Sequence, residues 1–246
     1  MDTANLVKAI EVRCSRRKYQ GTPIESNIVA KLQEAITEYN RLGNVRMELV
    51  TNNGKAFKGI TKSYGMFSGV NDYIGLVASK NDSTNLERIG YFGELVVLHA
   101  TAMGLGTCWA GGSRSDMPFS LGNDEAIVCS ILLGNVDKEE SFKERLMKSA
   151  THLKTKSAED MFTSKGSIPN WFLNGMKAVQ KAPSAVNRQP VMFSFENGKV
   201  SATVKDISNT LMAIDFGIAK LHFELGAGGG KWEWGNGGIF THEPAN

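Results

Sequence analysis

The chain has 246 residues, of which 41% are hydrophobic and 22% charged, and its 28 basic and 25 acidic residues leave a net charge of +3. These values predict a soluble folded core, built as one large domain or as two small, intimately packed ones. No Lys/Arg run forms the concentrated stripe that nucleic-acid binding requires, so we expect no nucleic-acid partner.

Cysteine usage and hydropathy predict where the protein works. Cys14, Cys108 and Cys129 have no CxxC spacing, and an odd count argues against a disulfide framework and for a reducing compartment. No cationic start followed by an apolar run marks a signal peptide, and no apolar stretch approaches the roughly 20 residues of a membrane span. We therefore expect a cytoplasmic protein without a membrane partner. No His/Cys/Asp spacing resembles a metal site, and none is expected.

Hydrophobic periodicity predicts mixed helices and strands. Apolar residues recur at helical spacing in residues 4–14 and 26–39, and residues 85–103 form a long helix that is apolar almost all round. Residues 45–50 alternate as a strand, and residues 74–78 and 126–133 are apolar enough for buried strands. The polar residues 138–165 are expected to wrap over the surface.

The last third of the chain repeats this plan. Residues 175–199 align without gaps on residues 31–55, and both segments run from a helix through a loop and an alternating strand to Asn-Gly-Lys. Residues 221–232 align on residues 98–109, and in each a helix with Leu-His leads to a glycine-rich stretch that ends in Trp. We predict a duplication, with a first half at 1–165 and a truncated second half at 166–246, packed as one unit. His99 and His222 lie on apolar helices and are predicted to be core residues.

Three short motifs carry the chemistry. The first, Arg-Cys-Ser-Arg-Arg-Lys-Tyr at 13–19, places Arg13, Ser15 and Arg17 at alternate positions, where guanidinium and hydroxyl groups can bind a phosphate. The alternative is a solvated basic helix end. The second, Ala-Pro-Ser-Ala-Val-Asn-Arg-Gln-Pro at 182–190, offers small residues and planar amides to a flat heterocycle. The alternative is an ordinary loop between a helix and a strand.

The third motif is Gly-Thr-Cys-Trp-Ala-Gly-Gly at 106–112. Its glycines allow a ligand to approach the backbone closely, because no side chain intervenes. The alternative is a helix C-cap and turn, with Trp109 in the core.

Together the motifs resemble the FMN-binding elements of the nitroreductase family, and the resemblance spans nearly the whole chain. The family pattern Arg-Arg-Ser-x-Arg binds the FMN phosphate, and here Cys14 replaces its second Arg. The pattern Pro-Ser-x-x-Asn-x-Gln-Pro followed by an aromatic lies at the flavin ring, and here Val191 stands where Trp is usual. In relatives, main-chain N–H groups of the Gly-Thr-Cys-Trp element bond near the N5 and O4 atoms of the ring.

The resemblance implies a set of FMN-binding residues and no catalytic side chain, because the flavin carries the chemistry. The residues implied are Arg13, Cys14, Ser15 and Arg17 at the phosphate, Pro183, Ser184, Ala185 and Asn187 at the ring, Ala110, Gly111 and Gly112 near N5, Lys154 and Lys156 returning to the phosphate, and Asn71 at the pyrimidine edge. Tyr64 and Phe67 could line the substrate face, with core packing as the alternative for Phe67.

The resemblance also implies an architecture. In relatives the flavin sits between two subunits, which contribute the first and second motifs, whereas this chain contains both. Residues 38–44, which align with the second motif, lack its Pro-Ser-x-x-Asn pattern. We therefore expect an internal pseudo-dimer with one FMN per chain, for which a monomer is possible. The implied fold is α+β and nitroreductase-like, with a central, mostly antiparallel sheet flanked by helices around a long buried pair.

The activity implied is that of an FMN-dependent oxidoreductase. NADH or NADPH would reduce the flavin, which would pass electrons to a small-molecule acceptor such as a nitro-aromatic or a quinone. One alternative keeps FMN but changes the reaction, for example to reductive dehalogenation or flavin fragmentation. Another is a non-enzymatic protein that binds or scavenges flavin, or a degenerate relative without the cofactor.

Overall fold

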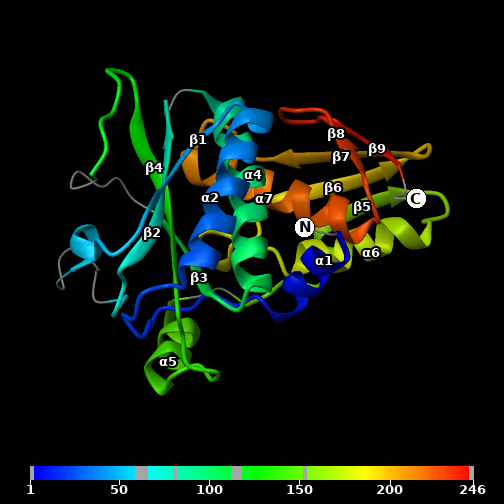
Figure 1. The fold of residues 1–246 in the computed structure, drawn as a ribbon. Coiled ribbons are helices and arrows are strands. Elements are labelled where there is room, and N and C mark those ends of the chain that lie inside the picture. Colours follow the sequence, from blue (N-terminus) through cyan, green and yellow to red (C-terminus); the bar gives the residue numbers. More distant parts are fainter. Residues whose placement is uncertain (1–2, 59–65, 80–81, 112–117, 152–153, 244–246) are drawn as a thin grey trace.

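The computed structural model describes residues 3–58, 66–79, 82–111, 118–151 and 154–243. Two β-sheets lie on opposite sides of a central layer of helices (Figure 1). One apolar core fills the space between the helices and the first sheet, and a second fills the space between the helices and the other sheet. The α+β class and the mostly antiparallel pairing are confirmed, but the strands form two sheets rather than one central sheet.

The first sheet is antiparallel throughout, in the order β1-β2-β4-β3. Its strands are β1 (Arg46–Val50), β2 (Asp72–Ala78), β3 (Gly106–Gly111) and β4 (Ala126–Gly134). Every residue of β2 is buried, because Ile74 and Leu76 face the core under the helices while Tyr73 packs in a separate apolar cluster. Burial on both sides explains why the strand reads as a continuous apolar run. The strands expected in this half are confirmed.

The second sheet has the order β5-β6-β7-β9-β8. Its strands are β5 (Phe162–Lys165), β6 (Val191–Glu196), β7 (Lys199–Val204), β8 (Gly230–Trp232) and β9 (Ile239–His242). Residues 138–165 lie largely at the surface, as expected, and they also form α5 (Phe142–Thr151), the short helix η2 (Glu159–Met161) and β5. Strand β5 is polar because it forms an exposed edge, and it pairs in parallel with β6.

Two long helices, α4 (Ser83–Ala102) and α7 (Thr210–Gly226), form the central pair. Each helix begins at a side-chain cap. The Asp82 carboxylate accepts from the Asn85 amide of α4 at 2.9 Å. The Asn209 side chain accepts from the Leu211 and Met212 amides of α7, both at 3.1 Å. The helices cross in close contact at two glycines. A Cβ added at Gly90 would lie 2.0 Å from the Ile214 carbonyl oxygen, and one at Gly217 would lie 1.8 Å from that of Glu87.

The remaining helices pack around this pair. They are α1 (Thr3–Val12), α2 (Ser26–Gly43) and α6 (Asn170–Gln180), with short helices η1 (Gly54–Phe57) and η3 (Ala185–Asn187) in the loops. Helix α2 is longer than predicted and continues through residues 38–43, which were expected to be a loop. Helix α6 ends at Gln180, since Pro183 disfavours helical backbone before it. Within the described residues no helix is long and apolar enough to cross a membrane.

The helix caps define how the two halves correspond. The first residues of α2 and α6 are separated by the same number of residues as the aligned segments 31–55 and 175–199. The cap residues Asp82 and Asn209 are likewise as far apart in the sequence as the crossing glycines Gly90 and Gly217. The Leu-His match at 98–99 and 221–222 has an offset four residues shorter, so that alignment is about one helical turn out of register.

Candidate functional site

Two adjoining cavities gather the predicted motifs. The first, of about 250 Å³, lies between β3, the first half of α7 and the loop around η3. The second, of about 500 Å³, lies between the end of α1, residues 13–15 and the end of α6. Ser15, Pro183 and Ser184 line both cavities. Stretches from the start and the last third of this single chain therefore meet at one place.

The first motif runs beside the third. Ser15 forms a parallel bridge with Thr107, and the Arg16 amide donates to the Thr107 carbonyl at 2.8 Å. Thr107 opens the stretch whose next residues, from Cys108 to Gly111, line the first cavity. This stretch is strand β3 rather than a cap and turn, and Trp109 packs against the apolar core, as that alternative expected. Because β3 is the edge strand of its sheet, its outer side faces the motif and the cavity.

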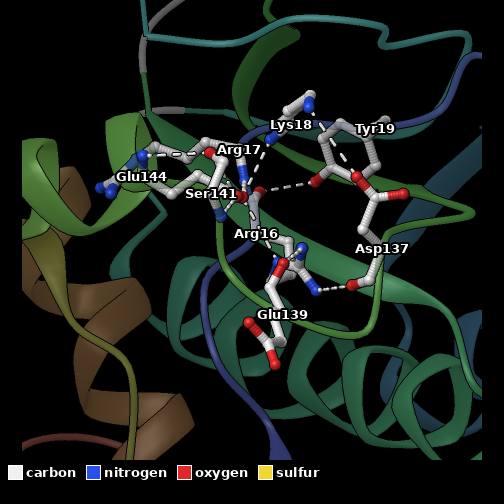
Figure 2. Close-up of polar contacts among 8 residues, drawn as sticks. All are labelled: Arg16, Arg17, Lys18, Tyr19, Asp137, Glu139, Ser141 and Glu144. Atoms are coloured by element: carbon white, nitrogen blue, oxygen red, sulfur yellow. Dashed lines mark hydrogen bonds and ion pairs between the residues drawn. The ribbon is translucent and has the colours of Figure 1, made fainter.

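Glu144 fixes the backbone of the first motif (Figure 2). Its Oε1 accepts from the Arg17 amide at 2.7 Å and the Lys18 amide at 3.0 Å, and its Oε2 accepts from the Ser141 amide at 2.8 Å. Burial alone would raise the pKa of Glu144, but the hydrogen bonds from Arg17, Ser141 and Lys18 outweigh it and lower the pKa to about 2. The sequence analysis missed this residue, although Ser-x-x-Glu at 141–144 is the pattern of a capping box.

The arginines of the first motif serve different places. Arg16 is structural: its guanidinium donates to the carbonyls of Asp137 at 2.8 Å and Glu139 at 3.2 Å (Figure 2). Arg17 lines the first cavity, and Arg13 lines the second. Both guanidinium groups act on the Cys108 thiol and oppose the effect of burial on its pKa. The assignment of Arg13 and Arg17 to one phosphate stays a prediction.

Arg13 is oriented by buried and backbone groups. Its Nη2 donates to the Lys181 carbonyl at 3.4 Å, and its Nε lies 3.9 Å from Oε1 of Glu94. The fully buried Glu94 also accepts from Nε1 of Trp109 at 2.7 Å and pairs with Nε2 of His222 at 3.0 Å. One carboxylate on α4 thus touches a wall of the first cavity and a cation of the second. His222 is a core residue, as predicted.

The second motif has unusual backbone. Val186, Asn187 and Gln189 have φ angles of 49°, 55° and 46°, in the left-handed region that side chains disfavour. Gln189 is held on several sides: the Ser184 hydroxyl accepts from its amide at 2.9 Å, and its own carbonyl accepts from Nζ of Lys156 at 2.8 Å. Strained backbone that contacts hold in place is often found at functional sites.

Asp215 is a cavity residue that the sequence analysis missed. It lies on α7, is 6% exposed and lines the first cavity, and both of its carboxylate oxygens are 3.1 Å from the Ala185 amide. Burial raises the pKa of Asp215 to about 7, against the opposing effects of the Ala185 hydrogen bond and of Arg188. The available signal was a lone acidic residue in the apolar stretch of α7.

Several predicted residues lie at the cavities and others do not. The first cavity is lined by Ala110, Gly111, Pro183, Ser184, Ala185 and Phe67. The second cavity is lined by Cys14, Pro183, Ser184 and Asn187. At the second cavity, Asn187 donates to the Thr155 hydroxyl at 3.1 Å. Gly112 and Tyr64 fall outside the described residues.

Three predicted residues are placed differently from expectation. The Lys156 ammonium donates to the Gln189 carbonyl, and Lys156 lines neither cavity. Lys154 is exposed and lines neither cavity. Asn71 also lines neither, because its amide donates to the Gly21 carbonyl at 2.6 Å.

Comparison with known proteins places the chain in a family. Residues 5–227 match the family model described as "Putative TM nitroreductase". The chain belongs to this nitroreductase family. Family membership makes the protein an oxidoreductase by class. No curated protein matches the sequence closely enough to count as a relative.

Among solved structures similar to this nitroreductase-family chain, one shares its fold over nearly the whole length. A Thermotoga maritima protein described as a "putative nitroreductase" is similar with a TM-score of 0.64 and 21% identity, over 98% of this chain and 94% of that one. An FMN-dependent nitroreductase of Clostridium difficile gives a TM-score of 0.43 and 17% identity over 61% and 98% of the two chains. Nitroreductase A of Vibrio parahaemolyticus gives 0.42 and 16% over 56% and 70%.

The first cavity combines apolar walls from β3 and α7 with a few polar groups, a composition typical of small-molecule and cofactor sites. Among the residues that the structure describes, no group of three His, Cys, Asp or Glu side chains could hold a metal ion.

Proposed function

We propose that this chain is an FMN-dependent oxidoreductase that passes electrons from NADH or NADPH to a small-molecule acceptor such as a nitro-aromatic or a quinone. The proposal rests mainly on one observation: both predicted halves of a flavin site line two adjoining cavities in a single chain. Bound FMN would supply hydride and electron transfer, and the protein would bind and orient it.

The first cavity suits the flavin ring. Trp109 and Ala110 on β3 form one side, and Leu211, Ile214 and Ile218 on α7 form another. These apolar surfaces can cover a flat heterocycle, while backbone on the outer edge of β3 can bond to polar ring atoms. Arg17 also lines this cavity, and a cation there can stabilise negative charge that develops on the ring.

The second cavity suits the phosphate. Arg13 lines it, and its Nε is buried without a hydrogen bond to any described residue. Lys181 lines it too, and its ammonium pairs with the exposed Glu11. Arg13 also lies near a carboxylate, that of Glu94, and we assign it to the phosphate because it lines the cavity beside Ser15. The Ser15 hydroxyl at the junction can add a neutral donor. The combined volume falls within the range of about 300–1,000 Å³ usual for ligand sites.

The proposed compartment is the reducing cytoplasm. Cys14, Cys108 and Cys129 all lie within the described residues, and no disulfide joins them. Cys108 and Cys129 line the first cavity, and burial raises the pKa of both thiols, so they stay protonated beside the proposed ring.

Reconstitution with FMN tests the function directly. We expect purified protein, mixed with FMN and gel filtered, to retain close to one flavin per chain and to oxidise NADH or NADPH when a quinone is supplied. The visible absorption spectrum gives the stoichiometry. A colourless protein that retains no FMN would refute the oxidoreductase proposal, and retained FMN without NADH or NADPH oxidation would favour a flavin-binding protein.

A further inference from the structure

The loop at 181–190 is held differently at its two ends. Near the C-terminal end of the loop, Gln189 forms hydrogen bonds with the Ser184 hydroxyl, the Lys156 ammonium and the Gln180 carbonyl. At the end that faces the first cavity, the Ala185 amide donates to the carboxylate of Asp215. Because the loop backbone is in a disfavoured conformation, each contact that holds it matters to the shape of the cavity.

The surroundings of Asp215 are mostly apolar. On its own helix Ile214 and Ile218 face the same cavity, and on the side of α6 and β6 its neighbours include Val179 and Val191. Within the described residues, the titratable or charged groups around it on other elements are the exposed Arg188 of the loop and the Cys129 thiol of β4. Arg17 of the first motif and the Cys108 thiol of β3 line the same cavity.

No cation of the described residues lies within ion-pair distance of Asp215. Burial of the ionised carboxylate therefore carries a desolvation penalty that no ion pair offsets. The Ala185 amide donates a hydrogen bond to it. A carboxylate placed in this way destabilises the fold when it is ionised, so its presence calls for a reason in the site.

We propose that Asp215 is a positioning residue for the cofactor, whose ionised carboxylate holds the Ala185 amide and so keeps the cavity-facing end of the loop in the binding conformation. The inference rests on the proposed function. Ionisation strengthens the contact, since hydrogen bonds to a charged acceptor are stronger than neutral ones. Protonation weakens the contact, so cofactor affinity falls as the pH drops below neutral.

The same titration has the opposite effect on folding. The pKa of Asp215 is raised from 3.8 to about 7, so its contribution to stability is fully present below pH 3.8 and is lost as the pH rises through 7. Asp215→Asn removes the buried charge while it keeps an oxygen that can accept from Ala185. A positioning role therefore predicts a variant that binds the cofactor more weakly but folds at least as stably at alkaline pH.

The test compares wild type with Asp215→Asn, and uses Asp82→Asn as the matched control on an exposed helix cap. Dissociation constants for FMN are measured by quenching of flavin fluorescence from about pH 5.5 to about pH 8.5. We expect wild-type and control affinity to rise roughly fivefold across this range, and Asp215→Asn to be roughly fivefold weaker at the alkaline end with a flat profile. Riboflavin titrations remove the contribution of phosphate ionisation.

Thermal unfolding of the same proteins without flavin separates positioning from a structural role. Under the proposal, Asp215→Asn unfolds near pH 8.5 at the wild-type temperature or above it. Wild-type flavin affinity and pH profile in the variant would overturn the proposal, as would a joint loss of binding and of stability at alkaline pH.

Amide hydrogen exchange keeps the inference separate from the proposed function. If neither wild type nor variant binds FMN, the oxidoreductase proposal fails, and exchange at the Ala185 amide decides whether Asp215 holds the loop. Faster exchange in Asp215→Asn than in wild type would support that role, and equal rates would overturn it.

Discussion

At the scale of single residues, the two cavities depend on carboxylates that lie outside the motifs. Glu144 holds the backbone at Arg17, Glu94 contacts both Arg13 and Trp109, and Asp215 holds Ala185. Each of them joins segments that are distant in the sequence. The side chains proposed to touch the cofactor are therefore oriented by residues that a motif search does not reach.

Arg13 and Arg17 should have separable effects on flavin binding. Arg13→Ala removes a charged phosphate contact worth roughly 1.5–3 kcal/mol, so FMN affinity should fall about 10- to 150-fold while riboflavin affinity is unchanged. Arg17→Ala should weaken both ligands and alter the visible spectrum, because Arg17 lines the ring cavity. Isothermal titrations with the two flavins measure this, with the exposed Lys8→Ala as control. Equal loss of both ligands in Arg13→Ala would contradict the phosphate assignment.

Glu144 should make the fold sensitive to acid. Its pKa is lowered from 4.5 to about 2, so its contribution to stability is present above pH 4.5 and is lost as the pH falls towards 2. We expect Glu144→Gln to lower the free energy of unfolding by roughly 2 kcal/mol at neutral pH, and by much less near pH 2.

Urea unfolding at both pH values provides the measurement, and the exposed Glu159→Gln is the control. A deficit in Glu144→Gln that stays constant with pH would show that the ionised carboxylate is not the source of the stability.

At the scale of elements, the α4–α7 crossing is the most demanding contact. A methyl group at Gly90 or Gly217 would collide with backbone carbonyls of the partner helix, which cannot move aside as a side chain can. Each Gly→Ala change should therefore lower the free energy of unfolding by roughly 3 kcal/mol or more. Chemical denaturation measures it, with the exposed Gly122→Ala, which meets only a flexible Glu125 side chain, as control. Near-neutral results at both crossing glycines would mean that the helices separate easily.

Periodicity predicted the elements that are strongly amphipathic or strongly apolar. Helices α1, α2 and α4 and strands β1, β2 and β4 lie close to their expected ranges. Strand β5 was missed because its residues are mostly exposed and it depends on pairing with β6. The end of α2 was misplaced because a loop was inferred from the second half, where Pro183 breaks the helix.

At the scale of the whole molecule, the site residues were predicted less evenly than the elements. Motif letters pointed to Ser15, Ala110 and Ser184, all of which line the first cavity. They gave no warning that the side chains of Lys156 and Asn71 would be used in hydrogen bonds elsewhere. Such hydrogen bonds depend on three-dimensional neighbours, which sequence spacing does not encode.

The pseudo-dimer proposal makes a prediction about assembly. If the two halves supply the contact that relatives make between subunits, the protein should be a monomer with one FMN. Light scattering coupled to gel filtration would give a mass near 26.8 kDa, and flavin absorbance would give the stoichiometry. Two flavins per chain, or a dimer that dissociates only when flavin is lost, would contradict the proposal.

The order of the site along the chain governs when it can form during synthesis. The first cavity needs both Ser15 and Ile218, which the ribosome adds about 200 residues later. While the ribosome is still translating α7, the wall that this helix contributes does not exist, and α4 lacks the partner that covers it. A nascent chain that lacks α7 therefore has no complete first cavity. A ligand can bind in this cavity only after α7 has left the ribosome and packed against α4.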